Sequence, residues 1–96
     1  MKLKPGFANE YKLRHSQIWP ELATLLKDNG ISDYSIFLDE ETNILFAVQQ
    51  QSGHSSQDLG NTLIVQKWWA HMADIMEVNP DQSPVSKPLN MVFHLD

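Results

Sequence analysis

The fold of this chain is decided by residues 32–48, which read SDYSIFLDEETNILFAV. Two apolar runs, Ser32–Leu38 and Ile44–Val48, lie on either side of a polar turn over Asp39–Asn43. Strand-forming runs separated by a short polar turn are typical of a β-hairpin. We therefore predict two antiparallel strands in the middle of the chain.

Helical patterns lie on both sides of this hairpin. From Phe7 to Gly30 apolar residues recur at steps of three and four, which predicts a helix that ends at Gly30. Pro20 lacks a backbone N–H, so we expect a break near Ser16–Trp19 with Pro20 starting a second segment. Thr62–Met76 predicts a further helix, with one apolar side formed by Val65, Trp68, Trp69, Met72 and Met76.

The remaining segments complete the expected order of strands and helices. Met1–Lys4 is expected to be a short strand, and Asp58–Asn61 one helical turn. Pro80, Pro84 and Pro88 stiffen a loop that suits the rim of a pocket, and the alternation over Leu89–Leu95 predicts a final strand. The order strand, helix, strand, strand, helix, strand is that of the ferredoxin-like split βαβ fold, in the α+β class. We expect a single domain over residues 1–96.

Both faces of the expected hairpin are apolar. Apolar residues along the two strands fall into two sets that point to opposite faces of the sheet. One set is Phe37, Leu45 and Ala47, and the other is Ile36, Ile44 and Phe46. An uncovered sheet face is usually polar. The helices cover one face, so we predict that a homodimer covers the other by packing sheet against sheet.

Composition excludes several classes of protein. The chain has 96 residues, a formal net charge of −5 and no cysteine. An acidic chain is a poor partner for nucleic acid or an anionic membrane. Disulfides, thiolate metal sites and cysteine nucleophiles are excluded, and a cytoplasmic location is expected. No apolar run is long enough for a membrane span.

The histidines give the first indication of chemistry. His15, His54, His71 and His94 are too far apart in sequence to share one helix face, so we predict no local metal site, while a site assembled from distant segments stays open. His15 lies on an apolar helix face, where it is either a hydrogen-bonded core residue or a general acid or base. We expect His54 and His71 to be exposed and His94 to lie on the minority face of the last strand.

Aromatic side chains could surround a ligand near His15. Trp68 and Trp69 are adjacent and point about 100° apart on a helix, so only one can face straight into the core. The other either packs at the periphery or lines a cavity, where an indole suits the C–H face of a sugar. Tyr34 could reach a ligand between sheet and helix.

Four segments resemble the L-rhamnose mutarotase family, and together they cover nearly the whole chain. They are YKLRHSQIWPE at residues 11–21, GISDYSIFL at residues 30–38, WWAHM at residues 68–72 and NPDQSPV at residues 79–85. The resemblance implies a dimeric α+β barrel that interconverts the α and β anomers of L-rhamnose without metal or organic cofactor. It implies that His15 is the proton donor and that Tyr11, Tyr34, Trp68 and Trp69 bind the sugar.

Mutarotation requires one proton delivered to the ring oxygen and one removed from the anomeric hydroxyl. We expect His15 to deliver the first, while a tyrosine oxygen, a carboxylate or water could accept the second. Two alternatives stay open: a non-catalytic sugar-binding or sensor domain, and a cofactor-free oxygenase or haem-handling protein on the same dimeric barrel.

Overall fold

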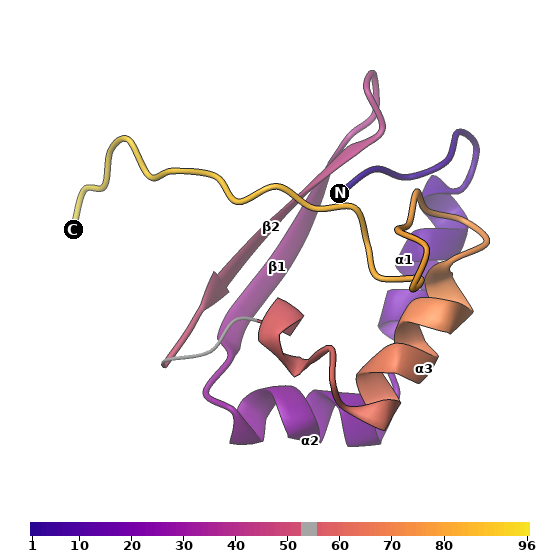
Figure 1. Ribbon diagram of the computed structural model, residues 1–96. Coiled ribbons are helices and arrows are strands. Elements are labelled where there is room, and N and C mark those ends of the chain that lie inside the picture. Colours follow the sequence, from indigo (N-terminus) through magenta and orange to yellow (C-terminus); the bar gives the residue numbers. More distant parts are fainter. Residues whose placement is uncertain (53–55) are drawn as a thin grey trace.

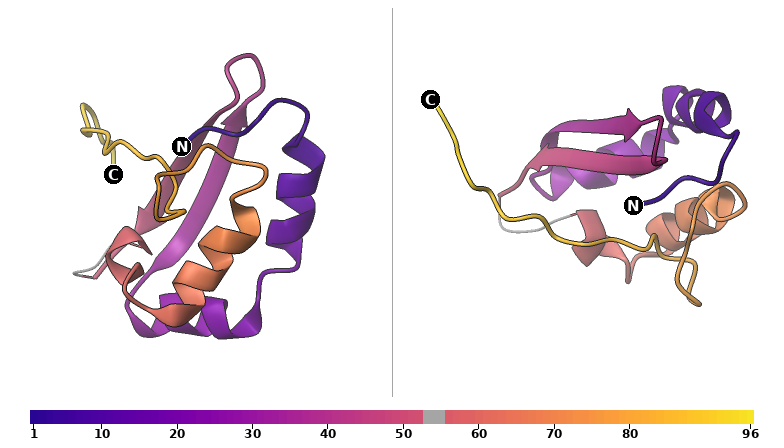
Figure 2. Two further views of the ribbon diagram at one scale, coloured as in Figure 1. Left: turned by 45° about the vertical axis from the view of Figure 1, so that its right-hand side comes forward. Right: turned by 90° about the horizontal axis from the view of Figure 1, so that it is seen from above.

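The computed structural model describes residues 1–52 and 56–96. The elements are α1 (Ala8–Ser16), α2 (Pro20–Asp28), β1 (Ser32–Asp39), β2 (Ile44–Gln50), the short 3-10 helix η1 (Ser56–Leu59) and α3 (Leu63–Met72) (Figure 1). The hairpin lies along one side, α1 and α3 lie side by side, and α2 crosses one end (Figures 1 and 2). This arrangement confirms the predicted α+β class. His54 lies outside the described residues.

The break between the first two helices falls where Pro20 predicts it. α1 ends at Ser16 and α2 begins at Pro20, which occupies the first helical turn. Trp19 is extended, with φ −62° and ψ 130°, because a residue before proline is disfavoured in the helical region. The break leaves His15 in the last turn of α1, at the end that faces α3.

The hairpin register shows which side chains share a face. Phe37 pairs with Phe46, and Leu38 pairs with Leu45. Directly paired residues of an antiparallel sheet point to the same side. The outer face therefore carries Phe37 and Phe46 together, which corrects the expected grouping of Phe37 with Leu45. Phe37 is 60% exposed, whereas Leu45 is 3% exposed.

Residues 1–4 lie between the hairpin and the segment that follows α3. The Leu3 N–H donates to the Asn43 carbonyl at 2.8 Å, and the Lys4 N–H donates to the Ile75 carbonyl at 2.9 Å. The expected first strand is present only as isolated bridges, Lys2 to Ile44 and Leu3 to Met76. These pairings nonetheless give the spatial order of the split βαβ fold, with the N-terminal segment in the centre.

Two expectations about the second half of the chain were wrong. α3 ends at Met72 rather than Met76, and the extended residues 75–78 take the position of the fourth strand beside the N-terminal segment. Leu89–Leu95 forms no strand but an extended tail that runs away from the rest of the molecule (Figure 1). Met76 pairs with Leu3, the Ile75 carbonyl accepts from the Lys4 N–H, and both side chains are buried. Among the described residues, residues 89–95 pair with no strand.

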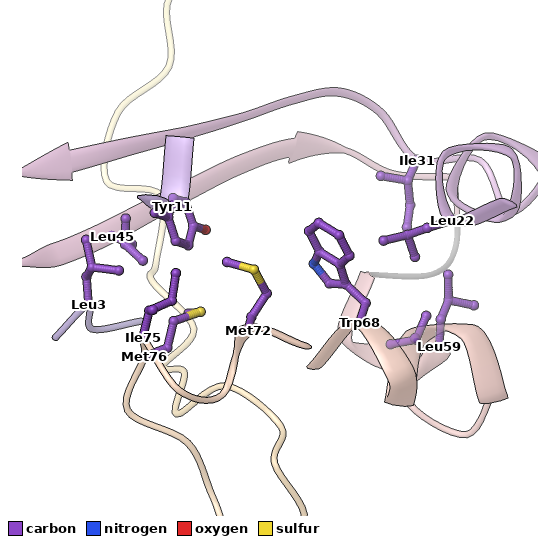
Figure 3. Packing of buried hydrophobic residues seen from close by; sticks show 11 residues of the cluster. Leu3, Tyr11, Leu22, Ile31, Leu45, Leu59, Trp68, Met72, Ile75 and Met76 are labelled. Atoms are coloured by element: carbon purple, nitrogen blue, oxygen red, sulfur yellow. The ribbon is translucent and has the colours of Figure 1, made fainter. Parts of the chain in front are cut away.

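The core lies between the hairpin and the helices. Figure 3 shows Trp68 between Met72 and the pair Leu22 and Ile31. The buried apolar residues are Leu3, Tyr11, Leu22, Ile31, Leu45, Leu59, Val65, Trp68, Met72, Ile75 and Met76. Because α1 contributes only Tyr11 to this set and α3 contributes three residues, α3 is the better anchored of the two helices that flank the site.

Candidate functional site

A cavity of about 880 Å³ lies between the inner face of the hairpin and the helices. Its size suits a small organic ligand. The five residues that the sequence singled out all line it: Tyr11, His15, Tyr34, Trp68 and Trp69. They come from α1, β1 and α3, so the fold brings together residues that are far apart in the chain.

His15 is half-buried between aromatic rings. Its ring stacks on Tyr11, with centroids 4.2 Å apart, and meets the edge of Trp68 at 5.4 Å. His15 Nδ1 lies 3.1 Å from the Tyr11 carbonyl oxygen. A carbonyl oxygen only accepts, so Nδ1 carries the hydrogen and donates it. Nε2 is therefore the nitrogen that can take up and release a proton.

Burial lowers the pKa of His15 below its ordinary value of 6.5, and the hydrogen bond to the Tyr11 carbonyl offsets only part of this effect. Removal from water disfavours the charged imidazolium. At neutral pH His15 is mainly neutral, with a lone pair on Nε2. The resting site therefore holds a proton acceptor rather than a proton donor.

The two tyrosines supply hydroxyl groups. Burial raises the pKa of Tyr11 well above its usual range, and the proximity of Tyr34 adds to the rise. The Tyr11 phenol therefore stays protonated and cannot serve as the base that mutarotation requires. It can donate and accept hydrogen bonds to a ligand hydroxyl.

Tyr34 is directed to the cavity by an irregularity in β1. The register shifts between Ser32 and Ser35, and Asp33 adopts φ +46°. A bulge of this kind re-aims neighbouring side chains and often lies next to a functional site. Beyond it Tyr34, Ile36 and Leu38 are half-buried while the residues between them are exposed. The side chain of Tyr34 thus shares the inner face of the hairpin.

The adjacent tryptophans both line the cavity, in different environments. Trp68 is buried, and its ring meets the edge of Trp19 at a centroid distance of 5.1 Å. Trp69 is half-buried. Trp68 is thus a core residue that also forms part of the cavity wall, whereas Trp69 is the more accessible indole.

The proline-containing loop lies at the cavity as expected, because Gln82 and Pro84 line it. The Asn79 N–H donates to the Ser83 carbonyl at 2.8 Å, and Gln82 is held at φ +70°. Internal hydrogen bonds thus hold this loop in a conformation that presents Gln82 to the cavity.

Sequence reasoning missed two residues that support this site without lining the cavity, Arg14 and Trp19. Arg14 links α1 to the end of α3 through Asp74 and the His71 carbonyl, and Trp19 packs on Trp68. Their positions in the motif around His15 were the only available signal. His71 is exposed, as predicted, but its ring lies 5.5 Å from that of Trp68.

The part of the chain that the structure describes contains no cluster of side chains that could bind a metal ion. Over residues 1–52 and 56–96, no three His, Asp or Glu side chains gather where they could hold an ion. His94 is exposed on the tail and pairs with Asp96 at 2.9 Å. The ionisable residues that line the cavity are Tyr11, Lys12, His15, Lys27, Asp33, Tyr34 and Glu40.

These features define an α+β protein with a site for a small polyhydroxylated molecule, since indole faces contact C–H groups and hydroxyls orient the ligand. The chain belongs to the L-rhamnose mutarotase family, whose family model matches residues 1–95.

Named relatives are similar to this chain over its full length. The L-rhamnose mutarotase of Bacteroides thetaiotaomicron is 68% identical over 100% of this chain and 93% of its own length. The protein of that name from Formosa agariphila is 65% identical over the same shares. A crystal structure of an L-rhamnose mutarotase from Formosa agariphila superposes with a TM-score of 0.94 at 62% identity, covering 100% of this chain and 93% of that one.

Proposed function

We infer that this protein is a carbohydrate isomerase that interconverts the α and β anomers of L-rhamnose. Membership of the family supports the reaction, and the cavity supports the ligand class. The observation that carries the inference is the half-buried imidazole of His15 in a cavity lined by Tyr11, Tyr34, Trp68 and Trp69.

Ring opening transfers one proton from the anomeric hydroxyl to the ring oxygen while the bond from C1 to the ring oxygen breaks. In the proposed mechanism neutral His15 accepts the anomeric proton at Nε2, and the imidazolium so formed donates it to the ring oxygen. Both oxygens are bonded to C1, so one nitrogen can serve both. His15 thereby remains the donor expected from the sequence, and no second base is needed. A positioned acid or base contributes about 10²–10⁴-fold to rate.

Rotation about the bond between C1 and C2 then presents the other face of the aldehyde, and the same steps in reverse close the ring. Trp68 and Trp69 are proposed to hold the apolar face of the sugar. Tyr11 and Tyr34 are proposed to bind its hydroxyls and fix its orientation relative to Nε2. Holding the sugar in one orientation lowers the entropic cost of the proton transfers.

We also propose that the protein acts as a homodimer. The outer face of the hairpin exposes Phe37 and Val48, which are 60% and 59% exposed, and the tail of residues 89–95 exposes a second apolar set. Contiguous exposed apolar surface marks a protein interface. A second copy of this chain has the complementary surfaces, and a two-fold axis would bring like faces together.

A cytoplasmic location belongs to this proposal, supported by the absence of cysteine. Across the described residues no helix has the length and apolar character needed to cross a membrane.

Exchange NMR on equilibrated L-rhamnose tests the activity, by following magnetisation transfer between the two anomeric protons. The protein should accelerate exchange, and His15→Ala should lower the catalysed rate by about 10²–10⁴-fold while sugar binding persists. His94→Ala removes an exposed histidine away from the cavity, and this control should exchange at the wild-type rate. Saturable binding without acceleration by the wild-type protein would instead indicate a sugar-binding domain.

A further inference from the structure

The position of His15 depends on how α1 is held against α3. Among the nine residues of α1 only Tyr11 is buried, and no side chain caps the N-terminus of the helix. Tyr11 is therefore the one fully buried anchor of this helix. His15 nevertheless has to keep a defined distance from Trp68, which belongs to α3.

Arg14 provides a second attachment. Its Nη1 donates to the Asp74 carboxylate at 2.8 Å, and its Nη2 donates to the other oxygen of that group at 3.2 Å. Paired hydrogen bonds between a guanidinium and a carboxylate fix direction as well as distance. Nη1 also donates to the His71 carbonyl at 2.7 Å, a group in the last turn of α3 that lacks a helical partner. A cation there also complements the negative end of the helix dipole.

The Arg14 side chain also forms a hydrogen bond within its own helix. Arg14 Nε donates to Glu10 Oε1 at 2.8 Å, one turn earlier in α1. The Arg14 side chain is only 15% exposed, whereas those of Glu10 and Asp74 are 41% and 66% exposed. The guanidinium thus lies between α1 and α3 with its bonding directions fixed on both sides (Figure 2 shows the two helices side by side).

We propose that Arg14 is a positioning residue, which holds His15 against Trp68 by fastening α1 to the C-terminal end of α3. Arg14 and His15 are consecutive, so a movement of the guanidinium anchor moves the backbone that carries the imidazole. Tyr11 and Arg14 then fix α1 at two points one turn apart, and the imidazole of His15 is oriented from both.

The test combines kinetics with NMR of His15 in Arg14→Met. We expect kcat for anomer exchange to fall about 10- to 100-fold, the scale expected for a displacement of about 1 Å. KM should change less than about threefold, because Tyr34, Trp68 and Trp69 lie outside α1 and keep their positions. The His15 ring resonances, which the ring of Trp68 on α3 shifts, should move as that ring contact is lost. Arg14→Lys should restore only part of kcat, because one ammonium cannot reproduce the paired bonds.

Two further variants complete the design. Asp74→Asn keeps the bonds of Arg14 to Glu10 and His71, so we expect a fall in kcat of about two- to fivefold and a smaller shift of the His15 resonances. Lys67→Met removes an exposed cation from α3 and should change neither kcat nor the His15 resonances. Asp74→Asn decides the question alone if Arg14→Met does not fold.

A folded Arg14→Met protein with wild-type kcat would overturn the proposal, and so would a loss of kcat without movement of the His15 resonances. Unchanged kcat and resonances in Asp74→Asn would do the same where Arg14→Met is unfolded. The kinetic readout rests on the proposed function, but the NMR readout does not. A wild-type protein that fails to accelerate exchange would therefore refute the isomerase while the resonances still decide the role of Arg14.

Discussion

The inner and outer faces of the hairpin carry similar side chains but have different surroundings. On the inner face Leu45 packs in the core and Tyr34 lines the cavity. On the outer face the paired Phe37 and Phe46 are exposed. The inner face of the hairpin thus forms part of the cavity within one chain. The outer face stays uncovered in one chain, and a second copy is proposed to cover it.

The largest difference between the faces should be in stability. Leu45→Ala should cost about 2–5 kcal/mol of unfolding free energy at any protein concentration, because it opens a cavity in the core. The cost of Phe46→Ala should decrease on dilution as the proposed dimer dissociates. Urea unfolding at two concentrations tenfold apart measures both. Equal, concentration-independent costs would contradict the distinction between the faces.

Self-association should be weakened next most strongly. Phe37→Asp places a charge in the proposed interface, where its burial is costly, so we expect the dimer dissociation constant to rise at least about tenfold. Sedimentation equilibrium measures this constant. Thr24→Asp adds the same charge at an exposed position on α2 and should leave it unchanged. A protein that is monomeric before any substitution would refute the dimer.

Sugar binding should depend on the cavity side alone. Trp69→Ala removes the more accessible indole, and we expect affinity for L-rhamnose to fall about three- to tenfold, in keeping with the contribution of an aromatic contact. Trp69→Phe should lower the affinity for L-rhamnose by less than Trp69→Ala does. Titration calorimetry, with L-rhamnose added until the protein is saturated, gives the affinities, and an unchanged value for Trp69→Ala would remove the stacking role.

The smallest effect is a dependence of stability on pH. The pKa of His15 is lowered in the folded state, whereas in the unfolded chain it stays near 6.5. The unfolded state therefore binds a proton first as the pH falls, so stability is complete above about 6.5 and decreases as the pH falls toward the folded-state pKa. The difference between wild type and His15→Gln in urea midpoints across this range isolates the contribution. No difference in slope would mean that His15 is not desolvated.

Local signals were enough for much of the fold. Pro20 marked the break between α1 and α2, and the polar turn over residues 39–43 marked the hairpin, because both depend on residues close in sequence. The fourth strand could not be located in this way, because the alternation of Leu89–Leu95 is as regular as that of any buried strand. Residues 75–78 take its place through pairing with residues 1–4, a contact that no local pattern encodes.

The site shows the same limit. The residue types at positions 11, 15, 34, 68 and 69 pointed to a ligand, and the resemblance to a family assigned them roles. The lowered pKa of His15 depends on burial between α1 and α3, which the sequence does not reveal. Arg14 and Asp74 are 60 residues apart, so their contact exists only once the two helices have packed.

The packing of indole rings around the cavity has an optical consequence. The chain has three tryptophans, and all of them belong to this region: Trp19 and Trp68 are in edge contact, and Trp69 lines the cavity. Tryptophan emission therefore reports on the cavity, including the inner face of the hairpin that lines it, and not on the tail. An unfolding curve followed by fluorescence would record the loss of packing around the cavity, and far-ultraviolet circular dichroism would be needed to follow the helices and strands as a whole.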